Sequence, residues 1–401
     1  MPQLANRYHS LGVSWIDTMP LRKGELLERG VDVIDLGAGD ADLLPPRAAV
    51  ERLKEAAEIP ALGRYGFGMG YRPFREAAVR FMDERFGETF DPITETIPLI
   101  GSKEGLSLLA MAYLSRDDVA IIPEPGFVSY IGGARLSEGT PHFVPLRPEK
   151  DFLLDVDEIP AEVADRARLM YLNYPNNPTA ATAPLSYLEE VVAWCREKDV
   201  LLAYDNAYSE LAFDGYQPPS IFHVPGAREI AMEFHTLSKT YNMTGWRLGW
   251  ANGKAEFIEV LAKVKTFVDM GQFMPVQAAG VAAMEARHEF IPGNVEVFRT
   301  RRDAAVEAWR EAGFIIDRPK ATMYVWIRLP EGVDDIDFTL RLMDEAGVIV
   351  IPGQGLGPSC AGYFRIALTT GVDRIVEGAQ RAGEVLAQMR QGEGTPAASP
   401  S

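Results

Sequence analysis

The stretch HTLSKTYNMTGWRLGW (235–250) places one lysine among hydroxyl side chains, with an arginine eight positions later. A lysine amine acts as a nucleophile only in its neutral form, which partial burial or a cationic neighbour favours. Arg247 can hold a phosphate through its planar guanidinium group. Most lysines are exposed surface cations, so this stretch alone leaves both interpretations of Lys239 open.

Two further motifs offer groups that bind a phosphate or a polar ring. In GSKEG (101–105), a glycine that permits an unusual backbone angle precedes Ser102 and Lys103 at the start of a predicted helix. The free N–H groups and dipole of a helix N-terminus suit a phosphate, although the same residues can form an ordinary cap. In NYPNNPT (173–179), two prolines predict a stiff turn that presents the Asn177 amide. Such turns are also common as plain connections between helices and strands.

The segment AYDNAY (203–208) ends an apolar run with a carboxylate. A carboxylate at the end of a buried strand is costly unless it is paired or faces a ligand cation. Tyr208 could offer its hydroxyl to the same ligand as Asp205. The competing role for Asp205 is the N-cap of a helix.

The four polar motifs lie where predicted strands end, and ligands of open α/β sheets bind at the carboxyl ends of strands. We predict strands at 95–100, 118–123, 168–174, 200–205, 229–236 and 246–252. Predicted helices at 48–59, 101–114 and 183–199 alternate with them. The run VLLAYD is nearly all apolar, as is typical of a parallel sheet covered on both faces. The alternation predicts a doubly wound α/β domain.

After about residue 290 the pattern becomes that of a smaller α+β domain. Helices are predicted at 295–313, 337–347 and 372–391, and strands at 321–329, 348–353 and 362–368. We therefore expect four parts, which are an N-terminal arm contributing to the small domain (1–45), a large domain (46–290), a C-terminal small domain (291–391) and a disordered tail (392–401).

The composition excludes several classes of protein. The chain has 401 residues, enough for two or three domains with a large core. Its net charge of −17 disfavours nucleic-acid binding. Two cysteines and five scattered histidines indicate neither a disulfide framework nor a metal site. Because no signal peptide or membrane-spanning run is evident, we expect a cytoplasmic protein with no membrane partner.

Together these motifs resemble the pyridoxal-5′-phosphate (PLP) enzymes of fold type I, and among them the class I/II aminotransferases. The motifs occur in the family's order, and the resemblance covers about residues 30–391. The segments IPLIGSKEGLSLLAMAYL, NYPNNPT and GYFRIAL are most similar to bacterial sequences assigned as LL-diaminopimelate aminotransferases. The resemblance implies a mainly parallel central sheet in a large domain, a smaller α+β domain, and a homodimer. It also implies amino-group transfer between an L-amino acid and a 2-oxo acid, with glutamate and 2-oxoglutarate as one pair.

The resemblance implies a role for each matching residue that binds the cofactor. Lys239 bonds covalently to the PLP aldehyde and, once a substrate amine has freed it, moves the substrate Cα proton. Asp205 pairs with the ring nitrogen. The other matching residues hold the ring oxygen, stack on the ring or hold the phosphate: Asn177, Tyr208, Phe127, Ser102, Lys103, Thr236, Ser238 and Arg247. Phe127 could equally be a core residue.

Three more residues match positions at the edge of the site. Arg365, in GYFRIAL, is implied to clamp the substrate α-carboxylate as a planar bidentate pair. Gly39, in LGAGDAD, would let the backbone approach the same carboxylate, although a glycine in a turn needs no such reason. Tyr65, in RYGFGMG, matches a tyrosine that reaches the phosphate from the neighbouring subunit.

The sequence departs from the family pattern at two positions. Ala180 stands where the family commonly has glycine. Gly68 stands where plant-type LL-diaminopimelate aminotransferases carry a glutamate that reads the distal end of the substrate, so the amino donor stays open. Acidic donors would need a second cation, from Arg22, Lys23 or Arg64, and aromatic donors or alanine would need an apolar pocket, from Trp15, Ile16 and Tyr130.

Other PLP chemistries also remain open, because one fold hosts many reactions. A PLP-dependent C–S or β-lyase would use the same lysine but would need no 2-oxo acid. A PLP-responsive transcription regulator would need a DNA-binding module, which the short, non-basic arm does not offer.

Overall fold

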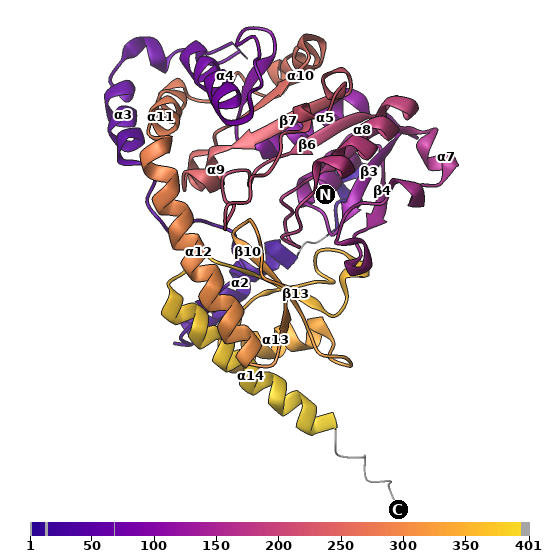
Figure 1. The fold of residues 1–401 in the computed structure, drawn as a ribbon, viewed down its shortest axis with the longest axis vertical. Helices are drawn as coiled ribbons and strands as arrows, with labels where there is room; N and C mark the ends of the chain where they lie inside the picture. The colour runs from indigo at the N-terminus through magenta and orange to yellow at the C-terminus, as the bar shows by residue number, and fades with distance from the viewer. Residues whose placement is uncertain (1, 13–14, 68, 394–401) are drawn as a thin grey trace, which may run out of the picture.

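The computed structural model of the protein describes residues 2–12, 15–67 and 69–393. Gly68 and most of the predicted tail, residues 394–401, lie outside these ranges. A seven-stranded and a four-stranded sheet form the two main layers of strands. The larger sheet lies in the upper part of Figure 1 and the smaller one below it, each with its own helices. The predicted α/β fold class is confirmed.

The larger sheet is mainly parallel, as predicted. Only β8 runs antiparallel to its neighbours, β2 and β7, and the other neighbouring strands pair in parallel. In spatial order the strands are β2 (Thr96–Leu99), β8 (Gly249–Gly253), β7 (Ala231–Thr236), β6 (Leu201–Asp205), β5 (Ala167–Leu172), β3 (Val119–Glu124) and β4 (Thr140–Pro145).

Helices cover both faces of this sheet, because successive strand side chains point to opposite faces. In β6, Leu201 and Ala203 join one buried apolar cluster, and Leu202 and Tyr204 join another. The first cluster packs under α5 (Ser102–Tyr113), α6 (Val128–Leu136) and α10 (Ala255–Val268). The second packs under α3 (Arg47–Ala57), α4 (Arg72–Phe86), α8 (Leu185–Lys198) and α11 (Met274–Glu285).

The smaller sheet is antiparallel and forms a second core. Its strands, in order, are β12 (Ile351–Pro352), β13 (Tyr363–Ala367), β10 (Tyr324–Arg328) and β9 (Ile315–Ile316). It shares a buried apolar cluster with α12 (Arg287–Glu311), α13 (Asp335–Ala346) and α14 (Val372–Glu393). The segment VIVIPG, predicted as one strand, forms two, because β11 (Val348–Ile349) pairs with the N-terminal arm instead of this sheet.

The N-terminal arm contains α1 (Asn6–His9), α2 (Trp15–Glu28) and β1 (Ile34–Asp35), none of which was among the predicted helices and strands. Met19 and Leu26, two helical turns apart, pack on apolar residues of α13, β11 and β12. Strand β1 pairs in parallel with β11. The arm therefore lies against the small sheet.

The remaining α-helices are single turns, α7 (Ala161–Ala164) and α9 (Leu237–Thr240). Within the described ranges, none of the helices has the length and apolar character needed to cross a membrane. The domain boundaries given above stay a prediction.

Candidate active site

The candidate residues converge at the carboxyl edge of the large sheet. Asp205 and Thr236 end β6 and β7, and Ser102 begins α5. Arg365 reaches the same place from β13 of the small sheet. Two cavities, of about 370 and about 420 Å³, lie between these elements. They share four lining residues: Phe127, Asn177, Lys239 and Tyr324.

The smaller cavity gathers the cofactor-binding residues that the sequence predicted. All of them except Tyr65 line it together with Lys239: Ser102, Lys103, Phe127, Asn177, Asp205, Tyr208, Thr236, Ser238 and Arg247. Tyr65 lies outside both cavities and is 69% exposed. Phe127 lines both cavities and also packs on a buried core cluster, so its position is compatible with ring stacking and with core packing.

Asp205 is buried, with one of its carboxylate oxygens unpaired. Tyr130 donates its hydroxyl hydrogen to Oδ2 at 2.7 Å, whereas Oδ1 has no hydrogen-bond partner among the described residues. Burial raises the pKa of the Asp205 carboxyl to about 6, although Tyr130, His235 and Lys239 oppose this shift. A buried acceptor without a partner is costly. Asp205 is therefore suited to a ligand that brings an N–H group or a positive charge.

The N-terminus of α5 forms the opposite type of site, one for an anion. Its N-cap is Gly101 at φ 71°, which leaves the first N–H groups of the helix without a side-chain cap. A Cβ at Gly101 would lie 2.5 Å from Nη2 of Arg247, so glycine lets this guanidinium lie beside the helix end. The hydroxyls of Ser102, Thr236 and Ser238 line the same cavity. This set of donors fits a phosphate.

Arg247 is held by neighbours that the sequence did not indicate. Its backbone lies in the left-handed region at φ 54°, and its Nη1 donates to the carbonyl of Thr244 at 2.8 Å. The side-chain amide of Gln272 donates to the carbonyls of Trp246 and Arg247. Thr236 Oγ1 caps α9 by accepting from the Ser238 N–H at 3.1 Å. These hydrogen bonds hold Arg247 and the start of α9 in place at the anion site.

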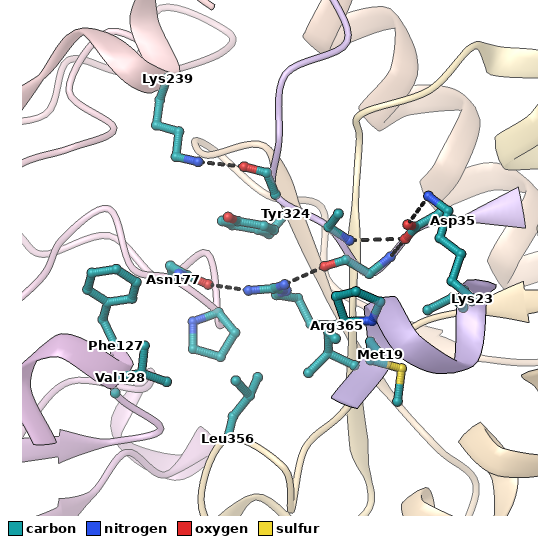
Figure 2. A pocket seen from close by; sticks show the side chains of 18 residues that line it. Met19, Lys23, Asp35, Phe127, Val128, Asn177, Lys239, Tyr324, Leu356 and Arg365 are labelled. Atoms are coloured by element: carbon teal, nitrogen blue, oxygen red, sulfur yellow. Dashed lines mark hydrogen bonds and ion pairs between the residues drawn. The ribbon is translucent and has the colours of Figure 1, made fainter. Parts of the chain in front are cut away.

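Lys239 lies on α9 at the boundary of the two cavities and is half-buried. Its Nζ donates to the carbonyl of Gly39 at 2.5 Å, as Figure 2 shows. A Cβ at Gly39 would lie 2.0 Å from the hydroxyl oxygen of Tyr324. The absence of a side chain at Gly39 therefore lets the arm approach both Lys239 and Tyr324.

Arg365 is 4% exposed, yet no carboxylate of the described chain forms an ion pair with it. Its partners are neutral oxygens, Asn177 Oδ1 at 2.9 Å and the carbonyl of Gly37 at 2.6 Å (Figure 2). The guanidinium also lies over the Tyr324 ring, 4.3 Å from its centroid. A buried charge without a counter-ion is suited to an anionic ligand such as an α-carboxylate.

Sequence reasoning missed Tyr324, a tyrosine of the site. Tyr324 lines both cavities and packs edge-to-face on Tyr208 at 5.8 Å. Burial acts to raise the pKa of Tyr324, but the charges of Lys239 and Arg365 hold it below its usual value. Tyr324 begins β10, and only its place at the strand end could have signalled a role.

Tyr130 was named above as a wall of an apolar donor pocket, and this prediction is wrong. It lies on α6, fully buried, stacked on Tyr171 with ring centroids 4.5 Å apart. Its hydroxyl is committed to Asp205. Trp15 packs on Gly355 and lies outside the cavity lining, and the Ile16 side chain lies outside the described part of the structure.

The larger cavity extends from Lys239 and Arg365 toward the N-terminal arm. Of the three cations proposed for an acidic donor, only Lys23 lines it, and Lys23 is paired with Asp35 at 2.8 Å. Arg22 lies near Asp344 on the surface, and Arg64 is exposed outside the cavity. The apolar part of the wall includes Met19, Pro20, Val128, Ile349, Ile351 and Leu356.

The departure at Ala180 falls on a strained backbone position. Ala180 is buried at φ 59°, in the left-handed region where a side chain costs about 1 kcal/mol. This explains the preference of related sequences for glycine at that position and indicates a small loss of stability here. The second departure, Gly68, lies outside the described residues.

Comparison with known proteins decides the class of this site. The model of the family described as aminotransferase class I and II matches residues 31–379. The chain belongs to this family. It is therefore an enzyme, an aminotransferase, and the predicted reaction class is confirmed.

Individual relatives agree with the family. The LL-diaminopimelate aminotransferase of Aquifex aeolicus (strain VF5) is 45% identical over 90% of this chain and 93% of its own length. That of Moorella thermoacetica is 42% identical over 91% of this chain and 94% of its own. The structure of an aromatic aminotransferase from Pyrococcus horikoshii OT3 superposes with a TM-score of 0.85 at 30% identity, covering 92% of this chain and 99% of that one.

The close contact of Gly39 with Tyr324 gives a first testable prediction. We expect Gly39→Ala to raise KM for the amino donor about tenfold, because the new Cβ forces Tyr324 and the Lys239 contact to shift. Gly24→Ala, in the same arm with open space around it, serves as the control and should leave KM unchanged. Adding Tyr324→Phe should partly relieve the Gly39→Ala defect. Steady-state kinetics decide, and an unchanged KM for Gly39→Ala would contradict this account of the glycine.

Proposed function

We propose that this aminotransferase uses PLP and moves an amino group between an L-amino acid and a 2-oxo acid, with glutamate and 2-oxoglutarate as one pair. The observation that carries the proposal is the Oδ1 atom of buried Asp205, which has no hydrogen-bond partner in the described part of the chain. It lies in a cavity that also holds Lys239 and the anion site beside Arg247. A phosphorylated ring with a protonated nitrogen satisfies both polar ends of this cavity at once.

When bound, PLP supplies an aldehyde that a lysine amine can hold covalently and a ring that takes up negative charge. Asp205 would keep the ring nitrogen protonated, and the amide of Asn177 and the hydroxyl of Tyr208 would bind the ring oxygen. Arg365 binds the substrate α-carboxylate and so orients Cα toward Lys239. The Nζ of Lys239, once free, removes the proton from Cα.

A homodimer forms part of the proposal. Large apolar side chains are exposed in two segments, with Tyr65 and Phe67 in one and Phe267, Val268 and Phe273 in the other. Contiguous exposed apolar surface commonly marks an interface. In the dimer, Tyr65 of the partner subunit reaches the cofactor phosphate, which accounts for the absence of Tyr65 from the cavity of its own chain.

The amino donor that fits best is LL-diaminopimelate. The curated relatives carry that name at 42–45% identity, and the larger cavity is lined by Arg365 and also by Lys23 and Asp35. A donor with a second polar end could use those groups, although the glutamate expected at position 68 is missing. The apolar wall around Met19 and Leu356 favours an aromatic donor as the second candidate.

A donor panel tests the proposed function. The PLP-loaded enzyme is assayed with 2-oxoglutarate and, in turn, LL-diaminopimelate, aspartate, alanine and phenylalanine, and glutamate formation is measured. We expect LL-diaminopimelate to give the highest kcat/KM, by about tenfold or more over the others, because one lost polar contact costs about 1–3 kcal/mol. Highest activity with phenylalanine would replace the substrate proposal by the aromatic one. A separate assay with a cysteine S-conjugate and no 2-oxo acid tests the lyase, because none of these donors carries a leaving group on Cβ. Release of the thiol, pyruvate and ammonia there would establish the C–S or β-lyase instead.

A further inference from the structure

The turn between β1 and α3 supplies backbone carbonyls to both reacting ends of the site. The carbonyl of Gly37 accepts from Arg365 Nη2 at 2.6 Å, and that of Gly39 accepts from Lys239 Nζ at 2.5 Å. Between them, the carbonyl of Ala38 accepts from Thr369 Oγ1 at 2.8 Å. The orientation of this short turn therefore affects the guanidinium that binds the substrate and the amine that moves the proton.

Little regular structure holds this turn in place. It follows β1, a strand of two residues that pairs with the equally short β11, and the carbonyl of Leu36 accepts from the Ala367 N–H at 2.7 Å. The turn lies over Ile349 and Ile351, which a Cβ at Gly37 would approach to 3.2 and 3.3 Å. A turn with so few backbone pairs needs side-chain contacts to fix its carbonyls.

Asp35 provides those contacts. Its Oδ1 accepts from the backbone N–H groups of Gly37 at 3.0 Å and Ala38 at 3.2 Å, and its Oδ2 accepts from Lys23 Nζ at 2.8 Å. Figure 2 shows this chain of contacts running from Lys23 through Asp35 to the turn and on to Arg365. Lys23 is 41% and Asp35 20% exposed. A pair this exposed adds little to folding stability, so its value lies in orienting the turn.

We propose that Asp35 is a positioning residue for the transamination site, and that Lys23 of α2 holds Asp35 in its working orientation. Asp35 fixes the peptide units of Gly37 and Ala38, so that the carbonyls of Gly37 and Gly39 face Arg365 and Lys239. The inference rests on the proposed function, in which Arg365 binds the donor carboxylate and Lys239 is the catalytic amine. Asp35 makes no hydrogen bond to Arg365 or Lys239 among the described residues and acts on both through the turn.

The inference predicts that loss of the Asp35 carboxylate changes KM but has little effect on folding stability. We expect Asp35→Ala to raise KM for the amino donor on the order of 10-fold to 100-fold, because small misplacements of substrate-binding groups have effects of this size. The unfolding temperature should change little. Asp35→Asn keeps an oxygen that can accept from the two N–H groups, so its KM should lie much closer to the wild-type value than that of Asp35→Ala. Asp32→Ala is the matched control, because Asp32 ties the same arm to α14 through Arg374 and Arg381 but does not contact the turn.

Hydrogen exchange gives a second readout that does not depend on turnover. Amide exchange of a peptide covering residues 36–40 should be faster in Asp35→Ala than in the wild type, with Asp35→Asn in between and Asp32→Ala unchanged. If the wild-type enzyme transferred no amino group at all, the proposed function would fail, while the exchange data would still show whether Asp35 holds the turn.

Three results would overturn the inference. One is an unfolding temperature that falls in Asp35→Ala while KM and exchange stay as in the wild type, which would make Asp35 a purely structural residue. Another is an equal rise of KM in Asp32→Ala, which would assign the effect to the arm as a whole. The third applies if Asp35→Ala does not fold, when KM is measured for Lys23→Met instead. We expect an increase of about threefold for this variant, and an unchanged KM would contradict the inference.

Discussion

Lys239→Ala is expected to lower the transamination rate by at least about 10⁴-fold, the upper range for loss of one acid–base group, because Lys239 also anchors the cofactor. Among the described residues no other lysine can take over, since Lys103 is the only other one lining the cofactor cavity and it lies over the Phe127 ring at the anion end. The variant should fold normally, because Lys239 is half-buried and its described hydrogen bond is a single contact with Gly39.

The measurement for Lys239 is single-turnover kinetics with the best donor. Lys254→Ala is the control, because Lys254 lies on the surface and pairs with Glu229 far from both cavities. Added methylamine should restore part of the rate in Lys239→Ala by taking the proton in place of Nζ. Retention of even a tenth of the wild-type rate would contradict the assignment of Lys239 as the catalytic amine.

Asp205→Asn is expected to reduce kcat by about 10²-fold to 10³-fold, the usual loss when one partner of a buried charge pair becomes neutral. An amide oxygen can still accept a hydrogen bond, but it no longer holds a positive charge on the ring nitrogen. Cofactor affinity should fall as well, which a titration of the apoenzyme with PLP measures. Full activity of the variant would contradict the pairing of Asp205 with the ring.

The same substitution should have the opposite effect on the stability of the apoenzyme. Burial raises the folded-state pKa of Asp205 to about 6, above the ordinary value of 3.8. The folded state therefore binds this proton more tightly, and its stabilising effect is lost as the pH rises from about 4 through about 6. The amide of the Asp205→Asn variant has no such proton to lose. Thermal unfolding of the two apoenzymes should agree near pH 4 and favour the variant at pH 7–8, and a constant difference across this range would contradict the raised pKa.

Much of the site follows from the sequence because its residues lie at the ends of strands. Asp205, Thr236 and Ser102 each stand at a junction between an apolar run and a helix or turn, and parallel strands bring their carboxyl ends to one edge. Local patterns therefore placed these side chains together without any knowledge of the fold.

The missed features depend on contacts between segments far apart in the chain. Tyr324 and Tyr130 look like ordinary core residues, and only the packing of β10 and α6 against the site gives their hydroxyls partners. Helix α2 was missed because Pro20 and Gly24 interrupt the spacing of its apolar residues. Its stability comes from packing on the small sheet.

The half-reaction tests the central claim most directly. The PLP-loaded protein is mixed with LL-diaminopimelate, and in parallel with glutamate, without any 2-oxo acid, and the absorbance of the bound cofactor is followed alongside Lys239→Ala. We predict that a donor converts the cofactor to its amine form with release of one equivalent of 2-oxo acid. Added 2-oxoglutarate should then restore the starting spectrum, and the variant should do neither. An unchanged spectrum with every donor, or equal conversion in Lys239→Ala, would contradict the account.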